Sequence, residues 1–245
     1  MSIAGYDPSA GAGVTADIKT FEQHGVYGFG VVTGLTWQND TSFMRVEWQT
    51  VQNIIDQVAL LLARFPITWI KIGLVGDITV LHEVIGYLYR AIPQPKIILD
   101  PVLKASAGFT FHDTAPEEFK TLMPKLFCIT PNMPEAEQLF GKENLSSKLA
   151  ESCDPCGIYL KGGHAASNIV TDTLLYKGII KTFRNPRLPF GEKHGSGCVL
   201  SAALTAQLAN GHDITTAAAL ANAYTNRFLN SNSTRLGYHS NISAL

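Results

Sequence analysis

The sequence predicts a three-layer α/β fold, in which helices cover both faces of a mostly parallel central sheet. Apolar runs rich in β-branched residues alternate with longer segments in which apolar residues recur every three or four positions. The connecting segments are short, so neighbouring parallel strands must be joined by crossover helices. Two extended runs separated by Lys177-Gly178 predict an antiparallel hairpin at one edge of the sheet.

Each element follows from one of these periodicities. Continuous apolar runs predict buried strands at 28–35, 69–72, 96–99, 126–129 and 158–160. The edge hairpin is expected to join 173–176 to 179–183. Helical periodicity predicts helices at 14–24, 51–65, 78–90, 134–140, 199–209 and 214–229. In such a sheet the ligand crevice lies beyond the carboxyl ends of the strands, so residues that follow strands are the first candidates for chemistry.

The composition is that of an ordinary globular protein. Its 245 residues are 46 % hydrophobic and 16 % charged, which excludes a disordered chain, and we expect a single domain over residues 1–245. A net charge of −1 without a basic block argues against nucleic acid as a partner. Neither a signal peptide nor a run of roughly 20 apolar residues is found, so we expect a cytoplasmic protein without a membrane partner. Cys153-Asp-Pro-Cys156 is interpreted as a loop with reduced thiols.

A first glycine cluster precedes the first helix. Ser9-Ala-Gly-Ala-Gly-Val-Thr-Ala16 matches the letters of the dinucleotide fingerprint of Rossmann dehydrogenases. That fingerprint needs a strand that turns directly into the helix, whereas residues 6–9 intervene here. We therefore favour a flexible loop whose free amides approach a small ligand. Asp17, one turn into the helix, either faces that ligand or interacts with the positive end of the helix.

A second glycine cluster, His194-Gly-Ser-Gly-Cys198, opens the helix expected at 199–209. Its amides can converge on an anion, but its spacing does not fit the nucleophile elbow of lipases. Cys198 falls in the first turn, where the helix dipole is expected to lower the pKa of its thiol. Close packing of small residues is the alternative explanation.

Three charged residues, Asp100, Glu135 and Lys161, come just after predicted strands. Two carboxylates, one cation and an anion-binding helix start are the groups that a magnesium–nucleotide site needs. Taken singly, each has an ordinary explanation, as a turn residue, a charge in the first turn of a helix or a surface lysine. Their convergence on the chemistry of one ligand favours a functional site.

Six segments follow a known family pattern in order along the chain. They are Ala4-Gly-Tyr-Asp-Pro-Ser-Ala-Gly-Ala-Gly-Val-Thr-Ala-Asp-Ile-Lys-Thr-Phe21, Leu35-Thr-Trp-Gln-Asn39, Asp100-Pro-Val102, Thr130-Pro-Asn-Met-Pro-Glu-Ala-Glu137, Lys161-Gly-Gly-His164 and His194-Gly-Ser-Gly-Cys198. In these segments the chain resembles the hydroxymethylpyrimidine/phosphomethylpyrimidine kinases of thiamine biosynthesis, which have a ribokinase-like fold. Sugar kinases of that superfamily carry aspartate at the position of Cys198.

The resemblance implies transfer of the ATP γ-phosphoryl group to 4-amino-5-hydroxymethyl-2-methylpyrimidine, followed by a second transfer to the monophosphate. It implies Cys198 as catalytic base, with the amides of Gly195, Ser196, Gly197 and Cys198 as an anion hole. The resemblance also implies ligand-binding residues. The pyrimidine would contact Gly5, Asp17, Gln38 and Val102, the ATP phosphates would contact Asn132 and Lys161, and Mg²⁺ would be bound through water by Asp100 and Glu135.

The sequence departs from the family pattern in one segment, and it leaves the substrate open. Leu103-Lys-Ala-Ser-Ala-Gly108 replaces the usual Met-x-Ala-Lys-Ser-Gly, which moves the lysine of that segment and puts any lid contact there in doubt. Pyridoxal or pyridoxine kinase of the same superfamily is the alternative function, because its substrate is also a flat ring with a hydroxymethyl group. A non-catalytic pyrimidine-binding protein and a dehydrogenase are further alternatives. We also expect a homodimer.

Overall fold

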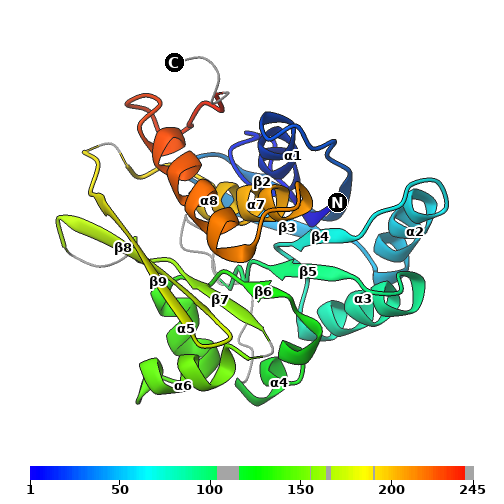
Figure 1. Cartoon of the computed structure of the whole chain (residues 1–245). Coiled ribbons are helices and arrows are strands. Elements are labelled where there is room, and N and C mark those ends of the chain that lie inside the picture. Colours follow the sequence, from blue (N-terminus) through cyan, green and yellow to red (C-terminus); the bar gives the residue numbers. More distant parts are fainter. Residues whose placement is uncertain (104–115, 155, 164–166, 190, 241–245) are drawn as a thin grey trace.

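A nine-stranded sheet runs through the middle of the described part of the molecule (Figure 1). The computed structural model describes residues 1–103, 116–154, 156–163, 167–189 and 191–240. The strands are β1 (Ser2–Tyr6), β2 (Gly30–Gln38), β3 (Phe43–Trp48), β4 (Trp69–Ile72), β5 (Lys96–Leu99), β6 (Cys128–Ile129), β7 (Gly157–Leu160), β8 (Ile169–Tyr176) and β9 (Ile179–Pro186). Their order is β3-β2-β1-β4-β5-β6-β7-β8-β9.

The inner strands from β2 to β7 are parallel, and the outer strands are antiparallel. β3 pairs with β2 at one edge, and β8 and β9 form a hairpin against β7 at the other edge. This is the predicted mixed sheet with its antiparallel edge hairpin. All carboxyl ends of the parallel strands therefore meet at one edge of the molecule, where ligand crevices form in this class of fold.

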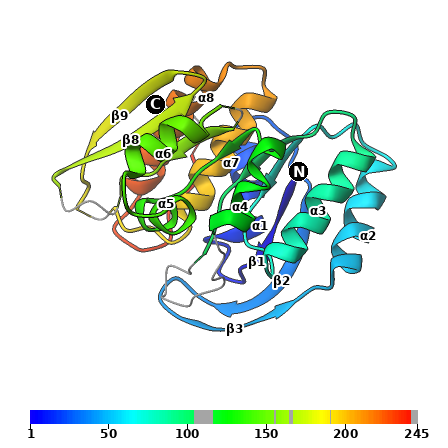
Figure 2. The same cartoon turned by 90° about the horizontal axis from the view of Figure 1, so that it is seen from below.

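Helices cover both faces of the sheet and complete the three predicted layers. They are α1 (Gly13–Gln23), α2 (Val51–Leu62), α3 (Ile78–Ala91), α4 (Pro116–Lys120), α5 (Met133–Phe140), α6 (Leu145–Ser152), α7 (Ser196–Ala209) and α8 (Ile214–Leu229). Figure 1 shows α1, α7 and α8 on one face, and Figure 2 shows the sheet and the other helices from below. A short 3-10 turn, Met123–Lys125, leads into β6.

Two large apolar cores, one on each face of the sheet, hold the layers together, and a small third cluster of Phe21, Ala202 and Ala206 joins α1 to α7. The larger core joins α2, α3, α5 and α6 to strand residues such as Ile70 and Ile72. The smaller core joins α7 and α8 to the opposite face. Both α7 and α8 are rich in alanine, and these small side chains allow the helices to pack closely on the sheet. Because successive strand residues face opposite sides, Lys71 points to the face covered by α1 and α7.

Most predicted elements are confirmed, and a few were missed. The strands at 69–72 and 96–99 and the helix at 214–229 have the predicted bounds, whereas other ends shift. β3 was not predicted, because its residues are partly exposed on an edge strand and mix polar with apolar types. The departure expected at 103–108 falls almost wholly on residues 104–108, outside the described residues.

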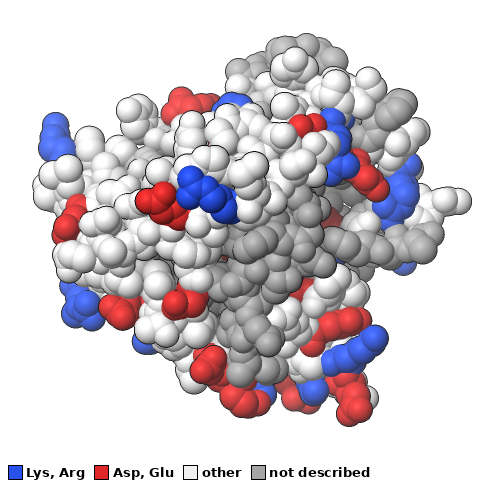
Figure 3. All heavy atoms as spheres, turned by 180° about the vertical axis from the view of Figure 1, so that it is seen from behind, with Lys and Arg blue, Asp and Glu red and all other residues white. Residues whose placement is uncertain are grey.

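The surface shows no strong charge segregation on the face drawn in Figure 3. Lysine and arginine are interspersed there with aspartate and glutamate, over the residues that the figure colours by charge. No helix in the described ranges is long and apolar enough to cross a membrane.

Because of His24, the fold is expected to become less stable as the pH decreases. Its Nδ1 lies 2.8 Å from Nε2 of Gln207, and its ring packs 4.5 Å from that of Tyr224. Burial, with a smaller effect of Arg227, lowers the pKa of His24 from 6.5 to about 4. Below pH 6.5 the unfolded chain binds a proton at His24, whereas the folded chain binds it only near pH 4. Protonation therefore favours the unfolded chain, and the free energy of unfolding decreases as the pH falls from about 6.5 to about 4.

Between pH 7.5 and 5 we predict that His24 accounts for a loss of about 1–2 kcal/mol in the free energy of unfolding, allowing for its partial contact with solvent. Urea unfolding of wild type and His24→Gln at both pH values measures this loss. His212→Gln, at an exposed histidine between α7 and α8, is the matched control. An unchanged pH dependence in His24→Gln would contradict the prediction.

Candidate active site

A cavity of about 600 Å³ opens at the carboxyl ends of the parallel strands. It is lined by residues that follow β1, β4, β5, β6 and β7 and by the start of α7. Every site residue predicted from the sequence lines it except Asp17: Gly5, Gln38, Asp100, Val102, Asn132, Glu135, Lys161, Gly195, Ser196, Gly197 and Cys198. The fold thus brings together segments that are far apart in the sequence.

Two glycine-rich loops interlock at one side of the cavity. Gly195 has φ +73°, and a Cβ placed on it would lie 2.0 Å from the carbonyl oxygen of Gly11. Gly13 has φ +62°, and its Cβ would lie 2.1 Å from the carbonyl oxygen of Gly5. Only glycine allows both the backbone conformation and these close approaches. Because β1 ends at Tyr6 and α1 begins only at Gly13, the first loop does not make the direct strand-to-helix turn of a Rossmann fingerprint.

Asp7 organises the first glycine loop and ties it to the second. Its buried carboxylate accepts hydrogen bonds from the Ser9 amide at 2.8 Å and from the Ala12 amide at 2.9 Å. His194 Nε2 lies 2.8 Å from the same carboxylate. Burial opposes the charge on Asp7, but the hydrogen bonds from His194 and Ser9 lower its pKa below the usual value. Asp7 and His194 stand in the motifs of the sequence, although their pairing was not predicted.

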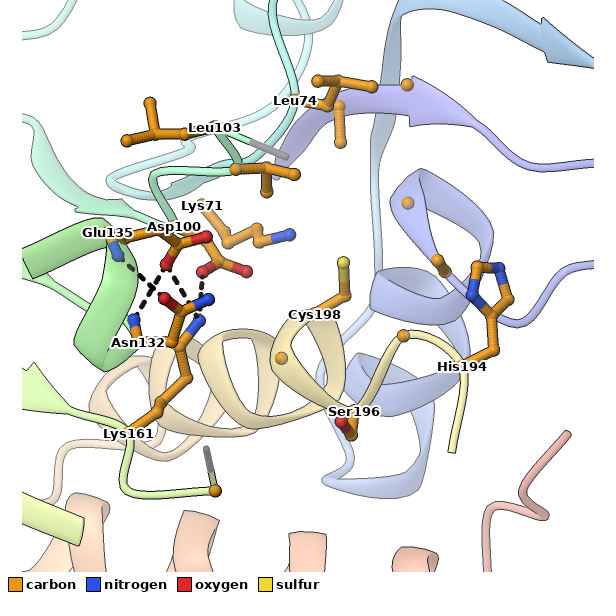
Figure 4. Close-up of a pocket in the computed structure, with 18 of the residues that line it drawn as sticks. Lys71, Leu74, Asp100, Leu103, Asn132, Glu135, Lys161, His194, Ser196 and Cys198 are labelled. Carbon is orange, nitrogen blue, oxygen red and sulfur yellow. Dashed lines mark hydrogen bonds and ion pairs between the residues drawn. The ribbon is translucent and has the colours of Figure 1, made fainter. Parts of the chain in front are cut away.

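Asp100 and Lys161 form a nearly buried ion pair at the floor of the cavity (Figure 4). Lys161 Nζ lies 2.8 Å from Asp100 Oδ1 and 3.9 Å from Glu135 Oε2. Thr130 and Ser201 each donate a hydrogen bond of 3.1 Å to Asp100. Burial opposes the charge on Asp100, but Lys161 and Lys71 outweigh it and lower the pKa of the carboxyl.

Glu135 and Asn132 serve both the helix and the cavity. Asn132 Oδ1 accepts from the Glu135 amide at 2.9 Å, and the Asn132 amide donates to Glu135 Oε2 at 2.8 Å, which makes a capping box at the start of α5. Burial raises the pKa of Glu135 to about 7, with Asp100 adding to the effect and Lys161 opposing it. The helix-start explanation of Glu135 is therefore correct, and the same residue also lines the cavity.

The amides at the start of α7 are largely free. Those of Gly195, Gly197 and Cys198 have no acceptor among the described residues, whereas the Ser196 amide donates to the carbonyl of Lys193 at 3.3 Å. Free amides at the positive end of a helix are suited to bind an anion. Three of the four amides predicted to form an anion hole are therefore free to bind a ligand, and the fourth, that of Ser196, already has an acceptor.

The predicted effect of the helix dipole on Cys198 is wrong. Burial raises the pKa of its thiol to about 11, and Asp17 and Asp100 add to this, while Lys71 and a hydrogen bond from the Gly13 amide oppose it. Burial and the carboxylates of other elements outweigh any effect of the residue's own helix, so Cys198 is a thiol at neutral pH.

Asp17 lies behind the cavity wall rather than in it. Its side chain is completely buried, and both of its oxygens accept hydrogen bonds from Lys71 Nζ, at 3.0 and 2.8 Å. In this structure it meets the cavity only through Lys71, which does line it. Sequence reasoning missed Lys71, although a lysine inside the apolar run Trp69-Ile-Lys-Ile72 was a visible signal.

A second cavity, of about 870 Å³, adjoins the first. Both are lined by Lys161, Gly163, Ser196 and Gly197, so they meet at the start of α7. The second cavity lies between β8, β9 and α8 and was not predicted. Its inner wall includes Asp172, whose carboxylate accepts from the Gly162 amide at 2.8 Å.

Comparison with known proteins identifies the family. The family model for phosphomethylpyrimidine kinase matches residues 7–243. This chain belongs to the phosphomethylpyrimidine kinase family. A hydroxymethylpyrimidine/phosphomethylpyrimidine kinase of Staphylococcus aureus (strain MRSA252) is 33 % identical over 225 residues, which cover 87 % of this chain and 81 % of the relative.

Solved structures place the fold of this phosphomethylpyrimidine kinase family member among ribokinase-like vitamin kinases. Phosphomethylpyrimidine kinase from Clostridium difficile 630 is similar with a TM-score of 0.76 and 31 % identity, covering 92 % of this chain and 96 % of that one. Pyridoxal kinase from Staphylococcus aureus in complex with ADP is similar with a TM-score of 0.85 and 26 % identity, covering 100 % of this chain and 94 % of that one. The chain is therefore a kinase of an ATP-dependent family.

The contact between the glycine loops predicts a strong effect of Gly195→Ala on kinase turnover. The new methyl group meets the Gly11 carbonyl and displaces the start of α7, and misplacement on this scale costs on the order of 100-fold in rate. Gly211→Ala is the matched control, because Gly211 also has a positive φ, +90°, but its Cβ meets nothing within 4 Å. Steady-state kinetics should show a rate within about twofold of wild type for that control. Equal losses in both variants would contradict a special role for the loop contact.

Proposed function

We propose that this kinase phosphorylates 4-amino-5-hydroxymethyl-2-methylpyrimidine and then its monophosphate, with ATP as donor, in thiamine biosynthesis. The observation that carries the proposal is the meeting of two cavities at the start of α7: Gly197, whose amide is free, lines both, and the free amides of Gly195 and Cys198 lie beside it in the first cavity. A phosphoryl group held there would stand between a nucleotide in one cavity and an alcohol in the other. Phosphoryl transfer depends mainly on such positioning and on electrostatic stabilisation.

The pyrimidine would occupy the first cavity. Gly5 and Val102 would line the flat faces of the ring, and Gln38 at the end of β2 would hydrogen-bond its polar edge. A Cβ on Gly5 would lie 3.1 Å from the Leu74 side chain, which also lines this cavity, so a larger residue at position 5 would crowd that wall. Cys198 at the far side of this cavity would then face the hydroxymethyl group.

ATP would occupy the second cavity, with its phosphates directed toward the first. Lys161 lines both cavities and would contact the phosphates as a point charge, and Asn132 would add its side-chain amide. Asp172, at the inner wall, holds the Gly162 amide and the Tyr159 hydroxyl and so fixes the backbone beside Lys161. Gly162 leaves no room for a larger residue, because its Cβ would lie 2.0 Å from the Thr171 carbonyl.

The residues present fit Mg²⁺ bound through water. Asp100 and Glu135 present two carboxylates on either side of Lys161, and no three His, Cys, Asp or Glu side chains of the described ranges form a complete metal cage. Mg²⁺ commonly keeps several waters and few protein ligands, and when bound it neutralises charge on the β- and γ-phosphate oxygens.

In the reaction, the hydroxymethyl oxygen attacks the γ-phosphorus, and the bond from that phosphorus to the β–γ bridging oxygen breaks. The bridging oxygen leaves with the electron pair on ADP. The hydroxyl proton passes to Cys198 in its thiolate form, and the free amides of α7 stabilise the transferring group. Because the thiol pKa is about 11, the thiolate is a minor form in the ligand-free protein.

A second candidate function is pyridoxal kinase. It is favoured by the similarity to Staphylococcus aureus pyridoxal kinase over the whole chain. The two functions differ in the ring that occupies the first cavity, while the nucleotide side of the site is the same. A comparison of substrates therefore separates them.

The experiment that tests the proposal is a panel of alcohols with ATP and Mg²⁺, scored by ADP release and by the mass of the product. We expect turnover of hydroxymethylpyrimidine and of its monophosphate, with kcat/KM at least about tenfold above that of pyridoxal, a difference of about 1.4 kcal/mol. A preference for pyridoxal would replace the proposed function by the second candidate. No ADP release with any of these alcohols would refute both.

The raised pKa of Cys198 predicts the pH dependence of the reaction. Between pH 7.5 and 9.5 the thiolate fraction rises about tenfold per unit, so kcat/KM should rise with a slope approaching one and without a plateau. Cys198→Ala should lower kcat by about 10²–10⁴ and lose this slope, with nucleotide affinity unchanged. A plateau below pH 8 in the wild type, or an unaltered profile in Cys198→Ala, would show that another group accepts the proton.

A further inference from the structure

Lys71 is a fully buried lysine in the middle of the sheet. The register of β1 and β4 sets it beside Ser2, and Asp17 of α1 lies above both side chains. Two of its N–H groups donate to the oxygens of Asp17, and Ser2 Oγ donates to Asp17 Oδ2 at 2.5 Å. The third N–H of Lys71 has no acceptor among the described residues.

That N–H belongs to a side chain that lines the first cavity. Figure 4 shows the Lys71 ammonium pointing across the cavity toward the sulfur of Cys198. A buried ion pair is by itself weak evidence of a stabilising role, because replacing such a pair by apolar residues of similar volume is often neutral or stabilising. The position of the ammonium beside the cavity suggests a role in the reaction.

The charges around the sulfur come from several elements. They are Lys71 of β4, Asp17 of α1, Asp100 after β5, Lys161 after β7, and the Asp7–His194 pair of the glycine loops. Burial opposes the charge on Lys71, but Asp17, Cys198 and Asp100 outweigh it and raise the pKa of Lys71 above its usual value. Lys71 therefore stays an ammonium, and it is the side chain that most favours a negative charge on the sulfur.

We propose that Lys71 is a positioning residue for Cys198: its ammonium, anchored by Asp17, stabilises the negative charge on the sulfur that accepts the substrate proton. Lys71 keeps its own protons throughout, and the proton of the alcohol ends on the sulfur. This inference rests on the proposed function for its catalytic meaning. The electrostatic claim itself concerns the ligand-free protein and can be tested without any substrate.

The test is the pH dependence of Cys198 alkylation by iodoacetamide in the full-length, substrate-free protein, followed by mass spectrometry of the peptide that contains Cys198. Cys128, Cys153 and Cys156 are buried and serve as internal monitors of unfolding. Lys71→Met keeps a similar shape and loses the charge, whereas Lys71→Arg keeps the charge and changes the shape. A role of the charge and a role of packing therefore predict opposite results for the two variants.

We expect Lys71→Met to raise the pKa of Cys198 by about one unit or more. Alkylation at pH 8.5 should then slow about threefold or more, since the smaller thiolate fraction is partly offset by a more nucleophilic thiolate. Lys71→Arg should stay within about twofold of wild type. Unchanged or faster alkylation of Cys198 in Lys71→Met, or equal slowing in Lys71→Arg, would overturn the proposal.

A second variant guards against misfolding, because Lys71→Met leaves Asp17 buried without its partner. The double variant Asp17→Asn/Lys71→Met leaves no unpaired charge. Because loss of the Asp17 charge by itself favours the thiolate, the double variant is compared with Asp17→Asn, and it must alkylate Cys198 more slowly than that variant. In active preparations, Lys71→Met should lower kcat by at least tenfold without raising the KM for ATP. If the thiol result holds and no alcohol is phosphorylated, the proposed function fails while the electrostatic role of Lys71 stands.

Discussion

Two buried ion pairs at the carboxyl ends of neighbouring strands set the geometry of this site. Asp17–Lys71 and Asp100–Lys161 alternate in sign beneath one cavity, with N–O distances of 2.8 Å in each pair. A charge left unpaired in such a place costs several kcal/mol, so β4, helix α1 and the ends of β5 and β7 must hold the partners together. The sheet can supply that precision because its central strands are covered on both faces by packed helices.

The glycine loops bring an anion-binding helix start to these charges. The backbones of Gly195 and Gly11 approach so closely that a Cβ on Gly195 would lie 2.0 Å from the Gly11 carbonyl oxygen, and the Asp7–His194 contact joins the two loops as well. The free amides of α7 then stand where two cavities meet, next to Lys161. The same arrangement supplies a positive environment for phosphates, while burial, helped by Asp17 and Asp100, keeps Cys198 protonated at rest. The proposed chemistry depends on this balance.

The sequence reveals those parts of the fold and site whose signal is local. Strands such as 96–99 are mostly apolar runs, and most predicted site residues stand in compact motifs that follow strands or open helices. What depends on distant residues was missed. The edge strand β3 forms only by pairing with β2, and the role of Lys71 depends on its ion pair with Asp17. The pKa of Cys198 depends on burial and on charged residues of other elements. The second cavity is lined by residues of β8, β9 and α8 together, so no single segment of the sequence predicts it.

The central claim is that alcohol, phosphoryl group and base converge at the start of α7. A crystal structure of the protein with Mg²⁺, a non-hydrolysable ATP analogue and hydroxymethylpyrimidine tests it most directly. We expect the γ-phosphate on the amides of Gly197 and Cys198, and the hydroxymethyl oxygen within hydrogen-bond reach of Cys198 Sγ, with Lys71 Nζ beside it. A pyrimidine bound with its hydroxymethyl group turned away from Cys198, or a γ-phosphate held elsewhere, would contradict it.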